Sequence, residues 1–160
     1  DISYSDYGKP FLRSGRLHFN LAHSGGLALY GFCLDREIGV DIERERDVSD
    51  ALAIARRFFS PGECSALEAL PEEQQKAAFF RCWTRKEAFI KAVGEGLSFP
   101  LNAFEVTLAP GQPVGLLTVR GLEEEARRWS LFSLAMPEGY CGATAVHDKN
   151  KYLRQWRYLD

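Results

Sequence analysis

The stretch Trp83-Thr84-Arg85-Lys86-Glu87-Ala88-Phe89-Ile90-Lys91, followed by Ala92-Val93-Gly94-Glu95-Gly96-Leu97, decides the fold of this chain. Within and just before it, apolar residues recur at the period of an α-helix, at Ala77, Phe80, Trp83 and Ile90. Gly94 suits the left-handed residue that ends a helix. The sequence therefore predicts a long helix that begins near Pro71-Glu72-Glu73, buries one face and stops at Gly94.

Three charged side chains stand close together on this predicted helix. Glu87 and Lys91 are one turn apart and project together, with Lys86 beside them. A carboxylate held near two ammonium groups is what a site for a metal and a phosphate requires. The alternative is a surface Glu–Lys pair that only supports the helix, which is the commoner meaning of an isolated pair.

A second set of carboxylates lies upstream, in Ile38-Gly39-Val40-Asp41-Ile42-Glu43. Alternation along a strand places its apolar side chains in the core, and Asp41 and Glu43 together on the outward face. Acidic residues are poor strand formers, so a solvated strand end before the charged residues 44–47 competes equally with a metal site. Together with Glu87, the two carboxylates supply three hard oxygen ligands, which favour Mg²⁺.

Two other segments carry polar groups of chemical interest. Asn20-Leu21-Ala22-His23-Ser24-Gly25-Gly26 is typical of a glycine-flanked turn, which can bring an imidazole and backbone N–H groups to an anion. A hairpin turn with a surface histidine is the simpler interpretation of that segment. Ser60-Pro61-Gly62-Glu63 has the pattern of a helix start, with a capping serine, proline at the first position and glutamate at the third.

The remaining pattern indicates an α+β fold. We expect a short strand over residues 16–22, a buried strand over residues 27–34, and a helix over residues 48–59 capped by Ser49. After Pro100 the period changes to two, which predicts strands at residues 104–108, 114–120, 129–135 and 140–146. Residues 151–158 form either an edge strand or a docked tail. The expected architecture is a mostly antiparallel sheet packed on one long helix.

Length and composition limit the classes that fit. The chain has 160 residues, enough for one domain or two small lobes, and its net charge of −2 gives no sign of nucleic acid or an anionic membrane as partner. The longest apolar run is too short to span a bilayer, and no export signal opens the chain. Four cysteines without a metal-binding spacing favour a reduced, cytoplasmic protein.

Two separated segments resemble the paired signature of the 4'-phosphopantetheinyl transferase superfamily. They are Gly39-Val40-Asp41-Ile42-Glu43 and Trp83-x-x-Lys86-Glu87-Ala88-x-x-Lys91-x-x-Gly94-x-Gly96-Leu97, and the distance between them also matches. The surfactin-synthetase-activating type is the more similar, because of three further segments: Tyr7-Gly8-Lys9-Pro10, Asn20-Leu21-Ala22-His23-Ser24 and Arg57-Phe58-Phe59-Ser60-x-x-Glu63.

The resemblance also implies a division of the chain. That type of transferase has two similar lobes with coenzyme A bound between them. Residues 1–36 would be the end of the first lobe, and residues 37–160 the second, metal-binding lobe. The chain begins without a methionine, as a processed form or a fragment would, and most of the first lobe would be missing from it.

The activity that the resemblance implies is transfer of the phosphopantetheine arm of coenzyme A to a serine of an acyl or peptidyl carrier protein, with release of adenosine 3',5'-bisphosphate. Asp41, Glu43 and Glu87 would hold Mg²⁺ on the pyrophosphate. Glu63 would be the base for the serine hydroxyl, a role that competes with its place as a helix cap. The contacts implied for coenzyme A are Lys9, His23, Ser24, Lys86 and Lys91, with both Lys86 and Lys91 also balancing charge during transfer.

Two other classes of function remain open at the level of sequence. One is a different Mg²⁺-dependent phosphate hydrolase built from the same three carboxylates. The other is a catalytically silent fragment of the same fold that binds a partner.

Overall fold

The computed structural model describes residues 1–13, 15–48, 50–148 and 152–158. Its strands are β1 (Ile2–Tyr4), β2 (Pro10–Leu12), β3 (Leu17–Ser24), β4 (Leu27–Leu34), β5 (Ile38–Arg44), β6 (Phe104–Val106), β7 (Leu116–Val119), β8 (Trp129–Ser133) and β9 (Tyr140–His147). Its helices are α1 (Ala51–Phe58), α2 (Pro61–Glu68), α3 (Glu72–Val93) and α4 (Glu123–Ala126), with 3₁₀ turns at Gly96–Ser98 and Leu101–Ala103.

Helix α3 is the long helix expected from the sequence. It runs for 22 residues and ends where Gly94 takes the left-handed conformation, at φ 82°, and donates its N–H to the carbonyl of Ile90. Glu72 and Glu73 lie in its first turn and Lys91 in its last, which is the charge order that a helix dipole favours. The predicted bounds and the terminating glycine are confirmed.

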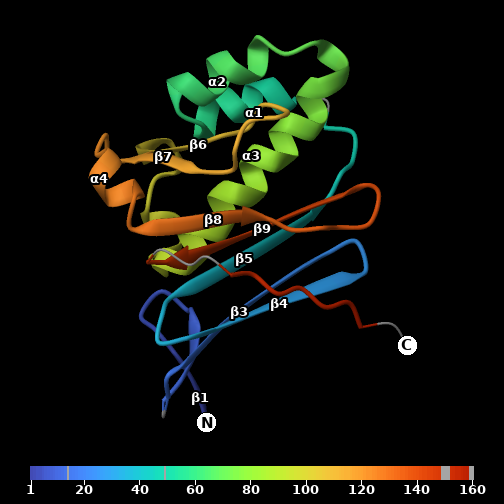
Figure 1. Ribbon diagram of the computed structural model, residues 1–160. Helices are drawn as coiled ribbons and strands as arrows, with labels where there is room; N and C mark the ends of the chain where they lie inside the picture. The colour runs from blue at the N-terminus through green and yellow to red at the C-terminus, as the bar shows by residue number, and fades with distance from the viewer. Residues whose placement is uncertain (14, 49, 149–151, 159–160) are drawn as a thin grey trace.

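The fold is built in layers around α3. Strands β5, β9 and β8 form an antiparallel sheet in that order, with α3 on one face and the β3–β4 hairpin on the other (Figure 1). Glycines allow these layers to approach. A Cβ on Gly39 of β5 would lie 2.1 Å from the carbonyl oxygen of Ala88, and one on Gly31 of β4 would lie 2.5 Å from Val40.

Two apolar clusters hold the layers together. The larger one joins α3 to α1, α2, the β6–β7 ribbon and the sheet, and it is rich in aromatic rings, including Phe79, Phe89 and Phe104. The smaller one lies between the hairpin and β5, around Ala22 and Val40. The expected α+β architecture, a mostly antiparallel sheet packed on a long helix, is confirmed, and all four strands expected after Pro100 are present.

The hairpin differs from the sequence-based expectation in two respects. Strand β4 is not buried, because its side chains alternate, and Tyr30, Phe32 and Leu34 are each 62% exposed on the outer face. The expected turn at His23 and Ser24 is also wrong. Both residues belong to β3, and the turn is confined to the two glycines that follow them.

Smaller elements also depart from expectation. The cap predicted at Ser49 lies outside the described residues, as does Lys151. The short helix α4 and the paired strands β1 and β2 are findings of the structure. Residues 152–158 form no strand, and Gln155 exchanges two side-chain hydrogen bonds with the backbone of Ala135, which supports the docked-tail alternative. None of the described helices has the length and apolar character to cross a membrane.

Candidate active site

Strand β5 directs its two kinds of side chain to opposite layers. Val40 and Ile42 face the hairpin, while Gly39 and Asp41 face α3, since the Gly39 position abuts the α3 backbone and Asp41 pairs with Lys91 of that helix. The expected alternation is therefore present. Its outward face is not solvent, however, because helix α3 covers it and leaves Asp41 only 4% exposed.

Asp41 and Lys91 form the centre of the site. The Asp41 Oδ1 atom lies 2.7 Å from the Lys91 ammonium, but its Oδ2 atom is buried and has no hydrogen-bond partner. Burial raises the pKa of Asp41 to about 7, although the positive charge of Lys91 acts against this rise. A buried carboxylate oxygen without a donor is costly, and this oxygen has the chemistry to accept a further cation.

Two more carboxylates act on the same place. The negative charges of Glu43 and Glu87 both raise the pKa of Asp41, so the three groups lie within electrostatic reach of one another. Burial raises the pKa of Glu87, Lys91 lowers it, and Glu43 raises it further. Helix α3 and strand β5 thus bring together the two sets of acidic residues that the sequence separates by more than forty positions.

The donor set fits a hydrated divalent ion. Among the described residues, no three histidine, cysteine, aspartate or glutamate side chains already surround one point that a metal could occupy. Two of the candidates are turned to other partners, Asp41 to Lys91 and Glu43 to Ser24. Mg²⁺ needs few protein ligands, because it retains several waters and takes its remaining oxygens from phosphate. The unpartnered Oδ2 of Asp41 is the strongest sign that these residues suit it.

The end of β3 reaches the same carboxylates. Ser24 donates its hydroxyl to Glu43 over 3.2 Å and accepts the N–H of Arg44 over 3.0 Å. His23 is exposed beside it, on the outer face of the hairpin. The structure therefore places Ser24 at the acidic cluster through a contact with Glu43, which the sequence did not indicate.

Lys9 is bound within the protein. Its ammonium lies 2.5 Å from Glu37 and donates to the carbonyl of Ala92 over 2.8 Å, so it connects the β1–β2 arm to the end of α3. Glu37 also meets the imidazole of His18 at 3.0 Å. Lys9, His18 and Glu37 line a hollow of about 260 Å³. No pattern in the sequence indicated this network.

Lys86 lies away from Glu87 and Lys91, and the expectation that it stands beside them is wrong. Its side chain has 0% exposure and pairs with Glu63 at 2.6 Å, on the side of α3 that faces α2 and β6. One step along a helix turns the chain by about 100°, which separates Lys86 from Glu87. The capping box at Ser60 and Glu63 is confirmed, since each side chain bonds the other's backbone N–H.

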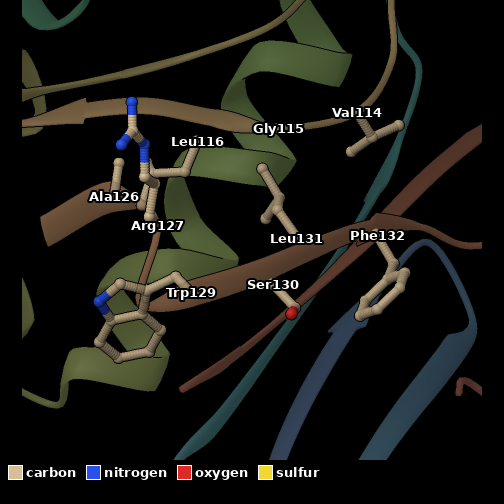
Figure 2. A pocket seen from close by; sticks show the side chains of 9 residues that line it. All are labelled: Val114, Gly115, Leu116, Ala126, Arg127, Trp129, Ser130, Leu131 and Phe132. Carbon is tan, nitrogen blue, oxygen red and sulfur yellow. The ribbon is translucent and has the colours of Figure 1, made fainter. Parts of the chain in front are cut away.

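A second hollow lies elsewhere on the sheet. It has a volume of about 340 Å³ and sits between β7, α4 and β8, with Leu131 standing up from β8 toward β7 (Figure 2). None of the residues predicted for the site lines it. Its walls include Leu116 and Trp129, with Arg127 at the rim.

Comparison with known proteins agrees with the signature in β5 and α3. The sequence model of the 4'-phosphopantetheinyl transferase superfamily matches residues 37–145. The chain therefore belongs to the 4'-phosphopantetheinyl transferase superfamily. It is 40% identical to the 4'-phosphopantetheinyl transferase HetI of a Nostoc species over 162 aligned residues, which cover 98% of this chain and 65% of that protein. It is 43% identical to the 4'-phosphopantetheinyl transferase Sfp of Bacillus subtilis, over 68% of this chain and 48% of that protein.

Solved structures show the same fold. The apo-ACPS structure from Chronobacterium ammoniagenes superposes with a TM-score of 0.53 at 18% identity, over 71% of this chain and 98% of that one. The ACPS–CoA complex from that organism gives 0.50 at 20% identity, over 72% and 98% of the two chains. The chain spans about half to two thirds of the length of the curated relatives named above, yet nearly all of these shorter structures.

Proposed function

We propose that this chain carries the metal-binding part of a transferase that moves the 4'-phosphopantetheine arm of coenzyme A to a serine of an acyl or peptidyl carrier protein. The observation that carries the proposal is the orphaned Oδ2 of Asp41, whose carboxylate pairs with Lys91 through the other oxygen and has its pKa raised by the charges of Glu43 and Glu87. Membership of the family and the coenzyme A complex of a structural neighbour agree with this assignment.

In this reaction the serine oxygen attacks the phosphorus that bears the pantetheine arm. The bond from that phosphorus to the bridging oxygen breaks, and adenosine 3',5'-bisphosphate leaves with the electron pair. Asp41, Glu43 and Glu87 are the residues that would hold Mg²⁺, which supplies a Lewis acid that polarises the attacked phosphate. Such transfers depend mainly on positioning and on neutralisation of charge.

The side chains of this protein supply the remaining charge. Lys91 is 30% exposed and lies beside Asp41, so it can neutralise the phosphate oxygens as the leaving group gains charge. His23 remains a predicted contact of the coenzyme A phosphates. Lys9 is assigned to the connection with Glu37 and Ala92, and Ser24 to the orientation of Glu43. The proton of the serine hydroxyl needs an acceptor, and the family-derived prediction for that role is Glu63. A cytoplasmic location is part of the proposal, because all four cysteines are free thiols.

Mass spectrometry of an apo carrier protein tests the proposal. The chain is incubated with the carrier protein, coenzyme A and Mg²⁺, and we expect the carrier to gain one phosphopantetheine arm. Asp41→Ala and Glu87→Ala should abolish this gain, whereas the exposed control Glu124→Gln should not. Release of adenosine 3',5'-bisphosphate without a carrier protein would identify a hydrolase instead. Binding of coenzyme A without transfer would identify a silent binding module.

A further inference from the structure

Lys86 is the most completely enclosed charged side chain among the described residues. It has 0% exposure, and its ammonium has three acceptors within hydrogen-bond distance: both carboxylate oxygens of Glu63, at 2.7 and 2.6 Å, and the carbonyl of Phe104, at 2.7 Å. The ring of Phe104 covers it, with its centroid 4.2 Å away. The ammonium donates hydrogen bonds to Glu63 Oε1 and to the Phe104 carbonyl, and its contact with Glu63 Oε2 is part of the ion pair. Enclosed in this way, Lys86 does not reach the surface at which a phosphate would bind.

Glu63 is held as closely. Its Oε1 atom accepts from Lys86 and from the N–H of Val106 at 2.8 Å, and its Oε2 atom accepts from the N–H of Ser60 at 2.8 Å and lies 2.6 Å from the Lys86 ammonium. The side chain is 2% exposed. A substrate hydroxyl could therefore reach Glu63 only after the packing around this network opens.

The pair joins three elements at one point. Glu63 belongs to α2, Lys86 to α3, and Phe104 and Val106 to β6. On another side, the same helix touches β5 by direct backbone contact at Gly39. Helix α3 is thus held from two directions, and its rotation about its own axis is fixed. That rotation sets where Glu87, the next residue after Lys86, points.

We infer that Glu63 and Lys86 are a positioning pair, which orients α3 so that Glu87 and Lys91 meet Asp41, and that neither takes part in proton transfer or phosphate binding. The inference rests on the proposed function for its activity readout. It changes the role of both residues from reacting groups to groups that act through Glu87, and the proton of the serine hydroxyl would then pass to water instead of to Glu63.

Charge burial gives the inference a distinctive signature. Removal of one member of a buried ion pair leaves an uncompensated charge and is strongly disruptive, whereas removal of both charges is far better tolerated. In Glu63→Gln/Lys86→Met, no uncompensated charge stays buried, and the amide oxygen still accepts one of the two backbone N–H groups that Glu63 binds, from Ser60 or from Val106. If the two residues are a positioning pair, Glu63→Gln should restore the function that Lys86→Met loses. If Glu63 is the base, Glu63→Gln should not restore transfer.

The experiment compares wild type, Glu63→Gln, Lys86→Met and the double variant. Each protein is measured for thermal melting, for Mn²⁺ affinity by electron paramagnetic resonance, and for transfer to a carrier protein. Lys76→Met and Asp47→Asn are the matched controls. Lys76 of α3 forms a surface ion pair with Asp47, with Nζ and Oδ1 2.7 Å apart. We expect Lys86→Met to lower all three quantities, and the double variant to regain at least about tenfold in transfer together with Mn²⁺ affinity and melting temperature.

Loss of a general base costs about 10²–10⁴-fold in rate. If Glu63→Gln and the double variant both lose transfer by that factor while melting and Mn²⁺ affinity stay at wild-type values, Glu63 is the base and the inference is overturned. If the wild-type chain transfers nothing, the proposed function fails separately. The inference then stands or falls on whether Mn²⁺ affinity drops in Lys86→Met and returns in the double variant.

Discussion

Asp41 and Lys91 face each other across the contact between β5 and α3, with Oδ1 and Nζ 2.7 Å apart, and the pair satisfies only half of the aspartate. The other oxygen is buried without a donor. A pair made only for stability would satisfy both oxygens, because an unmet buried acceptor costs about 1–3 kcal/mol. The incomplete pairing supports the proposed metal site.

The protonation of Asp41 should make the metal-free protein lose stability as pH rises. Its pKa is about 7 in the folded protein, against an ordinary value of 3.8. Between these two values the folded state holds a proton that the unfolded state has released, so the free energy of unfolding falls from about pH 4 to about pH 7. Urea unfolding in EDTA across this range measures the slope. Asp41→Asn should flatten it, and the exposed control Glu124→Gln should leave it unchanged. An equal slope in Asp41→Asn would contradict the assignment.

Addition of a divalent ion should reverse this loss. Mg²⁺ or Mn²⁺ binds the ionised carboxylates, so it must displace the proton, and the gain in melting temperature should be larger at pH 7.5 than at pH 5.5. An ion at 100 times its dissociation constant stabilises the folded state by about 2.7 kcal/mol. Differential scanning fluorimetry at both pH values measures the effect. Asp41→Ala and Glu87→Gln should remove it. A metal-induced shift that survives in both variants would place the ion elsewhere.

Many boundaries of the helices and strands could be predicted from short sequence patterns. The end of α3 could be read from Gly94, because a left-handed residue strongly favours glycine, and the helix start at Ser60 from its capping pattern. The exposure of β4 could not be read in the same way. Its apolar run Leu27–Leu34 looks buried on both faces, yet only the face toward β5 is covered by described residues. The apolar content of a strand indicates that one of its faces is suited to burial. It does not show whether another segment of the chain covers that face.

The parts of the site that could be predicted are those in which the spacing of residues along a single helix or strand determines where their side chains point. Glu87 and Lys91 share a helix face, so their proximity to each other followed from a period of 3.6, and the alternation of β5 placed Asp41 with Glu43. The same period turns Lys86 about 100° away from Glu87, so its separation from the site could also have been predicted. Its partner, Glu63, could not, because it lies 23 positions away on another helix. The same limit applies to Glu37, which meets Lys9 across 28 positions. Contacts of this kind depend on tertiary packing, which carries no periodic signal.

Gly39→Ala should disturb the site without altering any charged group. The new Cβ would lie 2.1 Å from the oxygen of Ala88 and 2.3 Å from the nitrogen of Ala92, which are backbone atoms of α3. Overpacking of this kind costs about 1–3 kcal/mol and forces the strand and helix apart. We expect lower melting temperature and weaker Mn²⁺ binding. Gly115→Ala is the control, since a Cβ there meets nothing within 4 Å. Unchanged Mn²⁺ affinity in Gly39→Ala would show that this contact does not set the geometry of the site.

Lys91→Ala should lower kcat more than it raises KM for coenzyme A. The ammonium contributes most when the leaving phosphate gains charge, so its loss acts on the transition state. The assay needs saturating Mg²⁺, because loss of Lys91 also removes the group that lowers the pKa of Asp41. Lys76→Ala, on the same helix and 47% exposed, is the control. A change confined to KM would reduce Lys91 to a group that binds coenzyme A in the ground state.

Lys9→Met should separate two possible roles of Lys9. The side chain is 14% exposed, and its ammonium is shared between Glu37 and the Ala92 carbonyl, so methionine keeps its length but removes the connection between the β1–β2 arm and α3. We expect faster amide hydrogen exchange in β1 and β2, with less than about a tenfold loss in the preference for coenzyme A over dephospho-coenzyme A. A charge-assisted hydrogen bond to the 3'-phosphate would contribute about 1.5–3 kcal/mol. A larger fall in that preference, with unchanged exchange in the arm, would assign the ammonium to the 3'-phosphate and Glu37 to its resting partner.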